Sequence, residues 1–295
     1  MKPELLMSHH PDWNWKRSVP YSQAVVGGDY IFIGGQQSLD SAGQVLGKND
    51  IATQTRNVFE NLKKVLDTAG LEMKDLVRLN TYYVFDGDDS DATAFWEAMT
   101  RVRLEYFPDP GPAATAVRVK GMPYPGQLIQ IEAIALNRKV HHSRQRIMPV
   151  ESWDWSISVP LSQGWRIGKK IFVGGQISAD ALGATVFPDD VKKQTRNIYK
   201  FIRNVVEGAG GDMGDVAHIK ICFKHEEGSN VSNEGLSLII EETSAIFSEN
   251  KGLVVSAFGV DLLYPGLVLE IDAMAVIDEE RYTVSLENAG EKYLL

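Results

Sequence analysis

The chain has 295 residues, 44% of them hydrophobic, and a formal net charge of −9 at pH 7. It has no apolar run near the ~20 residues that a membrane-spanning helix needs, and its acidic balance opposes non-specific binding to nucleic acids, which depends on Lys and Arg. Cys222 is the only cysteine, which excludes an intrachain disulfide and favours the reducing cytoplasm. We therefore expect neither a membrane nor a nucleic-acid partner.

The sequence repeats itself at a fixed offset of 140 residues. Residues 31–36 (IFIGGQ) return at 171–176 (IFVGGQ), and residues 54–57 (QTRN) return unchanged at 194–197. Two copies of about 125 residues match the usual size of a domain. The repeat therefore indicates a duplicated domain, and any site should be sought in both copies.

Between the copies lies a short stretch that is rich in Arg, Lys and His. A basic run can bind phosphate, but a solvated connector is the more common role of such a charge run. We therefore predict a first domain at 1–137, a basic linker at 138–150 and a second domain at 151–295.

Each copy shows the same order of predicted elements. In the first copy a β-branched and aromatic run closes at Gly34 and Gly35, and apolar residues at helical spacing then continue toward Gly70, a typical helix C-cap. In chain order we predict a strand at 31–33, a helix at 50–66, a strand at 77–83, a helix at 95–106, and strands at 114–119 and 127–136.

These elements give each copy the order β-β-α-β-α-β-β or one close to it. The order is typical of an α+β unit in which two helices pack on one face of a mixed β-sheet. The opposite face of such a sheet must also be covered. We therefore expect the domains to associate with one another through their sheets.

Five short motifs of the first copy occur in an order that resembles a known family. They are 20–23 (PYSQ), 32–36 (FIGGQ), 54–57 (QTRN), 112–113 (PA) and 129–135 (IQIEAIA). Each motif is weak alone, but together they span nearly all of 11–136, and a weaker form of the pattern spans 151–276. On these residues the chain resembles the Rid proteins, also called the YjgF family of reactive-intermediate (enamine/imine) deaminases.

The resemblance implies a fold, an assembly and a reaction. It implies two tandem chorismate-mutase-like (Rid/YjgF) domains, trimeric assembly, and pockets between neighbouring domains, with no cofactor and no metal. The family reaction is the hydrolysis of a small imine or enamine carboxylate to a keto acid and ammonia. This chemistry needs a cation for the carboxylate, a polarising group for the nitrogen and a positioned water.

The cation is missing from the position where the resemblance places it. The family's anchoring Arg directly follows Pro-Ala at the start of the penultimate strand, and its planar fork pairs both carboxylate oxygens. Here that position holds Ala114 in the first copy and, with a one-residue gap, Val255 in the second. Arg118 shares the strand face of Ala114 but lies about 13 Å further along, where a solvated sheet residue is the simpler interpretation.

The final strand differs between the copies at the position of the family's pocket carboxylate. That position is Gln130 in the first copy and Glu270 in the second. Strand alternation places Gln130 on one face with Glu132, and Glu270 on one face with Asp272. Glu270 would hold or activate water as a general base, whereas Gln130 binds a ligand but takes up no proton. An ordinary polar strand residue is the alternative interpretation.

The other candidate substrate-binding residues are also divided between the copies. Besides Gln130, they are Tyr21, Gly34, Gly35, Gly174, Gly175 and Asn233. Leu161 stands at the counterpart of Tyr21. The glycines serve either a tight turn or the close approach of a ligand.

Two further signals have structural interpretations. Cys222 lies on a predicted strand and is expected to be a core thiol, since buried free Cys usually behaves as a small hydrophobe. Trp153 and Trp155 are expected to be core or interface anchors, and Trp96 is expected to pack a helix.

The leading hypothesis is a divergent Rid-like hydrolase that acts on a small imine, enamine or related metabolite, with Glu270 as its catalytic residue. It would bind a small-molecule ligand and form a homo-oligomer, most simply of three two-domain chains. The alternative is a catalytically silent small-molecule-binding or scaffold protein, which the missing Arg favours. A ribonuclease, an activity attached to some family members, is a third hypothesis that the acidic charge disfavours.

Overall fold

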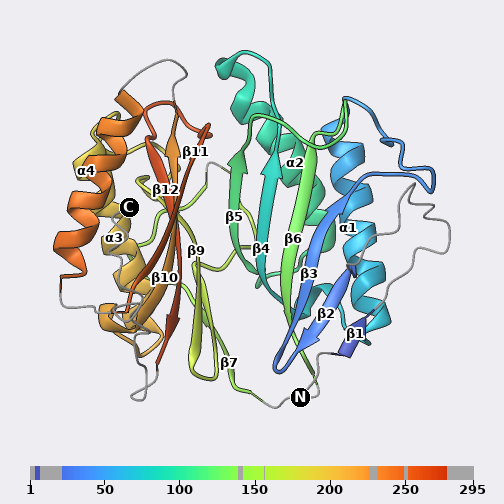
Figure 1. Cartoon of the computed structure of the whole chain (residues 1–295), viewed down its shortest axis with the longest axis horizontal. Helices are drawn as coiled ribbons and strands as arrows, with labels where there is room; N and C mark the ends of the chain where they lie inside the picture. Colours follow the sequence, from blue (N-terminus) through green and yellow to red (C-terminus); the bar gives the residue numbers. More distant parts are fainter. Residues whose placement is uncertain are drawn as a thin grey trace, which may run out of the picture.

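Two β-sheets stand face to face in the computed structural model, and each carries its helices on the face turned away from the other sheet (Figure 1). The structure describes residues 4–6, 22–138, 142–155, 157–225, 231–248 and 252–277. The blue-to-green half of the chain forms one sheet and its helices, and the yellow-to-red half forms the other. The two copies of the repeat are therefore two α+β domains.

The first domain contains every element expected from its sequence. Its elements are β1 (Glu4–Leu6), β2 (Ala24–Gly27), β3 (Tyr30–Gln37), α1 (Ile51–Thr68), β4 (Leu76–Tyr83), α2 (Ala92–Tyr106), β5 (Ala113–Arg118) and β6 (Ile129–Leu136). The strand predicted at 31–33 continues through the two glycines that were expected to close it.

The second domain repeats this order. Its elements are β7 (Arg144–Ile147), β8 (Gly164–Ile167), β9 (Lys170–Ile177), α3 (Val191–Gly208), β10 (Val216–Lys224), α4 (Val231–Ile246), β11 (Val254–Val260) and β12 (Leu269–Val276). No helix in these described parts of the chain is long and apolar enough to cross a membrane.

Both sheets are mixed, as predicted. The strand order is β1-β2-β3-β6-β4-β5 in the first sheet and β11-β10-β12-β9-β8-β7 in the second. The pairs β4·β5 and β10·β11 are parallel, and the other strand pairs are antiparallel. The parallel pairs arise because α2 and α4 cross over from one strand to the next, as a βαβ connection requires.

Helix α1 shows why these sequences form helices that cover a sheet. The Asp50 side chain accepts a hydrogen bond from the Thr53 backbone N–H at 3.1 Å and so caps the first turn. Val58, Leu62 and Leu66 recur at helical spacing and are no more than 2% exposed. Beyond the helix, Gly70 has φ of 69°, a left-handed conformation that glycine adopts without steric cost.

The basic stretch between the repeats has a different role from the solvated linker that was expected. Its residues Arg144–Ile147 form β7, which pairs with β8 of the second sheet. The Arg144 guanidinium lies 4.1 Å from the ring centroid of Trp165 and donates to the Leu76 carbonyl at 3.2 Å. Arg146 donates to the Leu161 carbonyl at 2.7 Å. These side chains therefore have protein partners, because the strand turns them toward both domains.

The two sheets meet most closely where β5 of the first domain lies beside β9 of the second. A side chain at Gly174 would bring its Cβ within 3.0 Å of the Ala114 carbonyl oxygen. Next to this contact, the Ser162 hydroxyl donates to the Gly111 carbonyl at 2.6 Å. The absence of a Cβ at Gly174 lets the strands approach. The two sheets therefore cover part of each other's inner face, as expected, while Phe32 of β3 and Val254 of β11 remain exposed.

Candidate functional site

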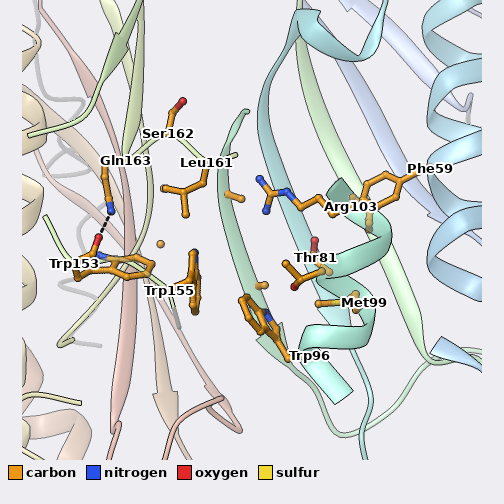
Figure 2. Close-up of a pocket in the computed structure, with 16 residues that line it drawn as sticks. Phe59, Thr81, Trp96, Met99, Arg103, Trp153, Trp155, Leu161, Ser162 and Gln163 are labelled. Atoms are coloured by element: carbon orange, nitrogen blue, oxygen red, sulfur yellow. Dashed lines mark hydrogen bonds between the residues drawn. The ribbon is translucent and has the colours of Figure 1, made fainter. Parts of the chain in front are cut away.

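A pocket opens between the domains at the contact of β5 and β9, and we call it the interdomain pocket. The first domain lines it with Ala114 and Ala116 of β5 and with one face of α2, and the second domain lines it with β9 and the 153–163 segment (Figure 2). Its volume is about 40 Å³, which is room for roughly three water-sized groups at about 10–15 Å³ each. The pocket therefore suits a compact ligand.

Three tryptophans form one apolar wall of the interdomain pocket. Trp96 of α2 lies against Trp155 with 4.6 Å between ring centroids, and Trp153 meets Trp155 edge-on at 4.7 Å. The Trp153 indole N–H donates to the Gln176 side-chain oxygen at 3.0 Å. This wall joins the two domains, so Trp153 and Trp155 anchor the interface, and Trp96 adds to its helix packing a place in the pocket lining.

Glu270 lies directly behind the pocket wall, between two residues that line it. The side-chain Oε1 of Glu270 occupies the space where Gly175 would carry a Cβ, which would be 1.8 Å away. From the facing domain, the backbone N–H of Ala116 donates to the Glu270 carboxyl group. Gly175 therefore serves the close approach of a carboxyl group, and the two domains together hold this group at the pocket.

Burial changes the protonation of Glu270. Desolvation, followed by repulsion from Asp272, raises the pKa of Glu270 to about 8, against the smaller opposing effects of Lys220, the Ala116 N–H and Arg78. A carboxyl group with a pKa near neutrality exchanges protons readily in both directions, which is the property of an acid–base catalyst. A pKa of about 8 would allow Glu270 to give up a proton as well as to accept one near neutral pH.

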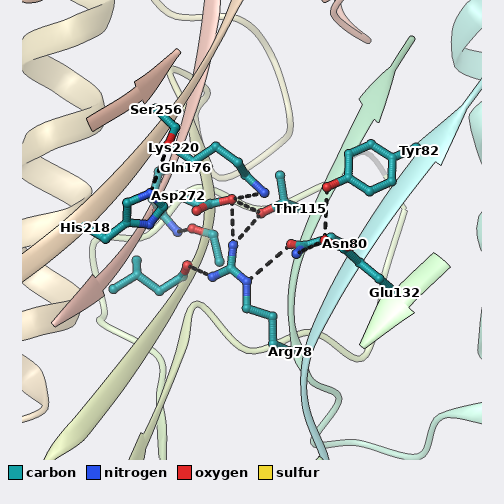
Figure 3. A network of polar contacts seen from close by, with 12 residues as sticks. Arg78, Asn80, Tyr82, Thr115, Glu132, Gln176, His218, Lys220, Ser256 and Asp272 are labelled. Carbon is teal, nitrogen blue, oxygen red and sulfur yellow. Dashed lines mark hydrogen bonds and ion pairs between the residues drawn. The ribbon is translucent and has the colours of Figure 1, made fainter. Parts of the chain in front are cut away.

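Asp272, two residues along the same strand, faces the same side and fixes the domains together. Its Oδ2 lies 2.6 Å from Nη2 of Arg78 on β4, 2.9 Å from Nζ of Lys220 on β10, and 3.0 Å from the Thr115 hydroxyl on β5 (Figure 3). Arg78 also donates to the Val173 carbonyl at 2.6 Å. A buried carboxylate with several charged and polar partners is a structural group, so the catalytic candidate on this strand is Glu270.

The first-domain candidates gather at a separate place. The Gln130 side chain lies over Gly35, where a Cβ would be 2.3 Å from its Nε2, and Gln37 donates to the Gln130 oxygen at 2.6 Å. Gly34 and Gly35 are exposed on β3. These residues do not line the interdomain pocket of the same chain, because the glycines that line it, Gly174 and Gly175, are on β9 and the facing strand is β5.

The remaining predicted residues have distinct outcomes. Leu161 lines the interdomain pocket and is buried, whereas its counterpart Tyr21 lies outside the described residues. Asn233 is in the first turn of α4, and its side chain lies outside the described part. Arg118 donates to the Phe85 carbonyl at 2.7 Å. Its Nε also lies 3.6 Å from an oxygen of Asp261 in the second domain, so Arg118 links the two domains and is not the solvated sheet residue that was expected.

Sequence reasoning missed Arg103, which lines the interdomain pocket from α2. Its Nε and Nη2 are buried and have no hydrogen-bond partner within the described parts of the chain, and burial lowers the pKa of Arg103 to about 10. A signal was present: Arg103 follows Trp96 and Met99 at i+7 and i+4, on the face that the helix turns toward the protein. A charge on that face is unusual and marks a position to examine.

Cys222 and the described residues of types able to bind metals do not line the interdomain pocket. Cys222 is buried between Val117 and Val260, and desolvation raises the pKa of its thiol well above the usual value, as expected of a core thiol. Among the described residues, no group of three or more His, Cys, Asp or Glu side chains is placed to hold a metal ion.

Comparison with known proteins matches one domain at a time. The sequence model of the family described as Endoribonuclease L-PSP matches residues 14–137 and again residues 156–277. A RutC family protein of Pyrococcus horikoshii is 40% identical over 116 residues, which are 39% of this chain and 86% of that protein. The 3-aminoacrylate deaminase RutC of Acinetobacter baylyi is 34% identical over 116 residues, with the same coverage of 39% and 86%.

One solved structure resembles the two-domain arrangement. A chorismatase crystal structure covers 86% of this chain and 76% of its own, with a TM-score of 0.62 and 15% identity. At this identity the likeness shows the fold, which agrees with the chorismate-mutase-like domains expected from the sequence. Since the family model matches both copies across most of the chain, this protein belongs to the Endoribonuclease L-PSP family, the Rid/YjgF proteins, as a tandem duplication of the family domain.

Proposed function

We propose that this protein is a divergent Rid-like hydrolase that cleaves the C–N bond of a small imine or enamine in the interdomain pocket. The observation that carries the proposal is Glu270, a buried carboxyl group that lies against the pocket-lining Gly175 and whose pKa burial raises to about 8. The relative described as a 3-aminoacrylate deaminase supports a substrate of this class.

Glu270 would move protons in both halves of the reaction. In its protonated form it gives a proton to the enamine carbon or the imine nitrogen, which produces an iminium ion. The carboxylate then takes a proton from the water that adds to the iminium carbon. The C–N bond of the resulting carbinolamine breaks, ammonia leaves, and a carbonyl product remains. A pKa close to the working pH serves both steps.

The test makes the same Glu→Gln substitution at two positions, one at the pocket wall and one on the exposed surface. Small 2-imino acids are generated in the assay by an amino-acid oxidase, and their hydrolysis is followed by ammonia release and by loss of semicarbazide-trapped imine. Glu270→Gln should reduce turnover by about 100-fold or more, the range of general acid–base catalysis, while Glu207→Gln, at an exposed position of α3, should leave it unchanged. Equal turnover by wild type and Glu270→Gln would remove Glu270 from the mechanism.

The alternative is a protein that kept the fold and binds a small molecule without turnover. Ala114 lines the pocket where the resemblance places the family's anchoring Arg, and this observation favours the alternative. It predicts that ligands raise the melting temperature while no imine is hydrolysed faster than in buffer. Acceleration by wild type that Glu270→Gln abolishes would exclude it.

We also propose that chains associate by the contact that joins the two domains. In the repeat, β11 and β3 are the counterparts of β5 and β9, and they carry exposed apolar side chains, among them Val254 at 60% and Phe32 at 49%. Pairing β11 of one chain with β3 of another would cover both surfaces. Three chains are expected from the resemblance; light scattering should give a multiple of 32.7 kDa, and a monomer that persists at high concentration would exclude the contact.

The proposed location is the cytoplasm. The single cysteine, Cys222, is buried and needs no oxidising compartment. A related protein of Schizosaccharomyces pombe, 40% identical over 118 residues that are 39% of this chain and 86% of that protein, is described as mitochondrial. Fractionation of cells that express the tagged chain distinguishes the two compartments.

A further inference from the structure

The interdomain pocket contains a cation, Arg103, two of whose buried donor nitrogens have no hydrogen-bond partner among the described residues. Arg103 projects from α2, and Figure 2 shows its guanidinium turned away from Phe59 and toward Leu161. Its Nε and Nη2 are buried without a hydrogen-bond partner in the described part of the chain. The ring of Phe107 lies 5.6 Å from the guanidinium carbon and attracts the charge but accepts no conventional hydrogen bond. Burying charged donors in this way is costly unless something else pairs with them.

The second domain shows that the fold itself does not require this cation. At the offset of 140 residues, Arg103 corresponds to Thr243 and Phe59 corresponds to Tyr199. These two side chains satisfy each other: the Tyr199 and Thr243 hydroxyls are 2.7 Å apart, and Thr243 donates to the Ile239 carbonyl at 2.7 Å. The same helix position is therefore occupied by a neutral, hydrogen-bonded side chain in one domain. In the other domain it holds a guanidinium whose Nε and Nη2 have no partner among the described residues.

The two unpaired nitrogens are the pair that grips a carboxylate elsewhere in this chain. Arg196 donates from Nε at 2.6 Å and from Nη2 at 2.8 Å to the two oxygens of Glu242. Nε–H and Nη2–H lie on one edge of the planar guanidinium and match the spacing of two carboxylate oxygens. The free edge of Arg103 is thus suited to a carboxylate, and the small volume of the pocket limits what this group can be attached to.

Arg103 and Glu270, the proposed catalytic carboxyl group, occur together at the interdomain pocket and not at its counterpart. Arg103 comes from the first domain and Glu270 from the second, and both are at the contact of β5 and β9. The counterparts Thr243 and Gln130 carry no charge. A pocket formed by those counterpart residues would lack both the Arg and the Glu. Each chain therefore has one pocket with both groups, although the domain is duplicated.

We propose that Arg103 is the anion anchor of the interdomain pocket and that the ligand is a compact monocarboxylate held by its Nε and Nη2. The cation that binds the carboxylate comes from helix α2 instead of from β5, where Ala114 carries no charge. The assignment of the ligand as a substrate rests on the hydrolase function proposed above, whereas the binding itself does not.

The experiment measures binding of defined carboxylates to the full chain. The probes are pyruvate and propionate, with propionamide as the neutral isostere, followed by ligand-observed NMR and calorimetry. Arg103→Met should weaken binding of both carboxylates by about 10- to 100-fold, the worth of a charge-assisted hydrogen-bonded pair, and Arg103→Lys should lie between. The control is Arg101→Met on the same helix, where Arg101 is exposed and pairs only with Glu97 among the described residues; it should bind like wild type.

A structural role for Arg103 would give a different pattern. Because its buried donors lack partners, Arg103→Met should melt at or above the wild-type temperature; a large fall in melting temperature together with unchanged binding identifies a packing residue. The proposal is overturned if Arg103→Met binds pyruvate as tightly as wild type, if propionamide binds as tightly as propionate, or if wild type binds neither carboxylate.

The outcome separates the anchor from the reaction. Glu270→Gln should retain carboxylate binding and lose turnover, whereas Arg103→Met should lose binding and raise KM. Carboxylate binding that depends on Arg103 without any imine hydrolysis by wild type refutes the hydrolase and leaves the anchor standing. Hydrolysis with an unchanged KM in Arg103→Met refutes the anchor and leaves the hydrolase standing.

Discussion

Replacing Glu270 by Gln should make the protein more stable at high pH than the wild type. The substitution suits the site, because the first domain carries Gln130 at the same position, against Gly35 as Glu270 is against Gly175. In the folded chain, burial and the nearby Asp272 raise the pKa of Glu270 from 4.5 to about 8. The folded state therefore keeps a proton that the unfolded state releases.

The direction and size of the effect follow from this difference. Below pH 4.5 both states are protonated and the carboxyl group imposes no penalty; as the pH rises from 4.5 through about 8, the unfolded state ionises first and wild-type stability falls. Since each unit of pKa difference corresponds to about 1.4 kcal/mol, the loss between pH 5 and pH 8 is on the order of 3–4 kcal/mol. The Gln side chain has no such titration, so its variant escapes the loss.

Thermal melts at pH 5, 6, 7 and 8 measure the difference between Glu270→Gln and wild type. For domains of this size the difference in melting temperature should grow by about 10 °C across the range, at about 2–4 °C per kcal/mol. Glu207→Gln, at an exposed position, controls for the loss of one negative charge and should track wild type. A gap that stays constant within about 2 °C would show that Glu270 ionises like an ordinary glutamate.

Two further substitutions test how the domains are joined. Arg78→Met removes the partner of Asp272 at 2.6 Å, while Lys220 and Thr115 remain as its partners. The change should cost about 1.5–3 kcal/mol of unfolding free energy, the worth of a hydrogen bond to a charged group, measured by urea denaturation; an unchanged unfolding free energy would contradict the buried pair. Gly111→Ala places a Cβ 1.6 Å from the Pro160 carbonyl oxygen, so the backbone must shift and the melting temperature should fall. Gly121→Ala, with open space around the new Cβ, is its control, and equal melting of both variants would refute the close approach.

The sequence predicted the fold well because local patterns and the repeat agreed. The helical spacing after Asp50 predicted a helix whose buried face, including Val58, Leu62 and Leu66, packs in the core of the first domain. The alternation from Val77 predicted β4, although Val77 itself packs against Ile167 and Phe172 of the second domain. The basic stretch was less well predicted, since Arg144 and Arg146 owe their roles to carbonyl groups that come from distant parts of the chain. A charge run carries no information about such partners.

The candidate site was predicted in part. Alternation placed Glu270 and Asp272 on one face of β12, and the structure gives them different surroundings: Asp272 has ion-pair partners, and Glu270 has desolvation and one backbone N–H. Arg103 could not be predicted from the family pattern, which places the cation on β5 at the position of Ala114. Arg103 becomes a candidate only because its face of α2 lines the interdomain pocket.

By itself, the sequence determined the duplication, the family, the order of strands and helices, and the loss of symmetry between Gln130 and Glu270. These are properties of local pattern and of comparison between the copies. Only the tertiary structure decided which strands of the two domains meet: it places β5 of one domain beside β9 of the other, so that Arg103 lines the pocket between them and Glu270 lies behind Gly175 in its wall. The physical reason is that burial, pKa and unpaired donors depend on the facing sheet, which no single strand or helix encodes.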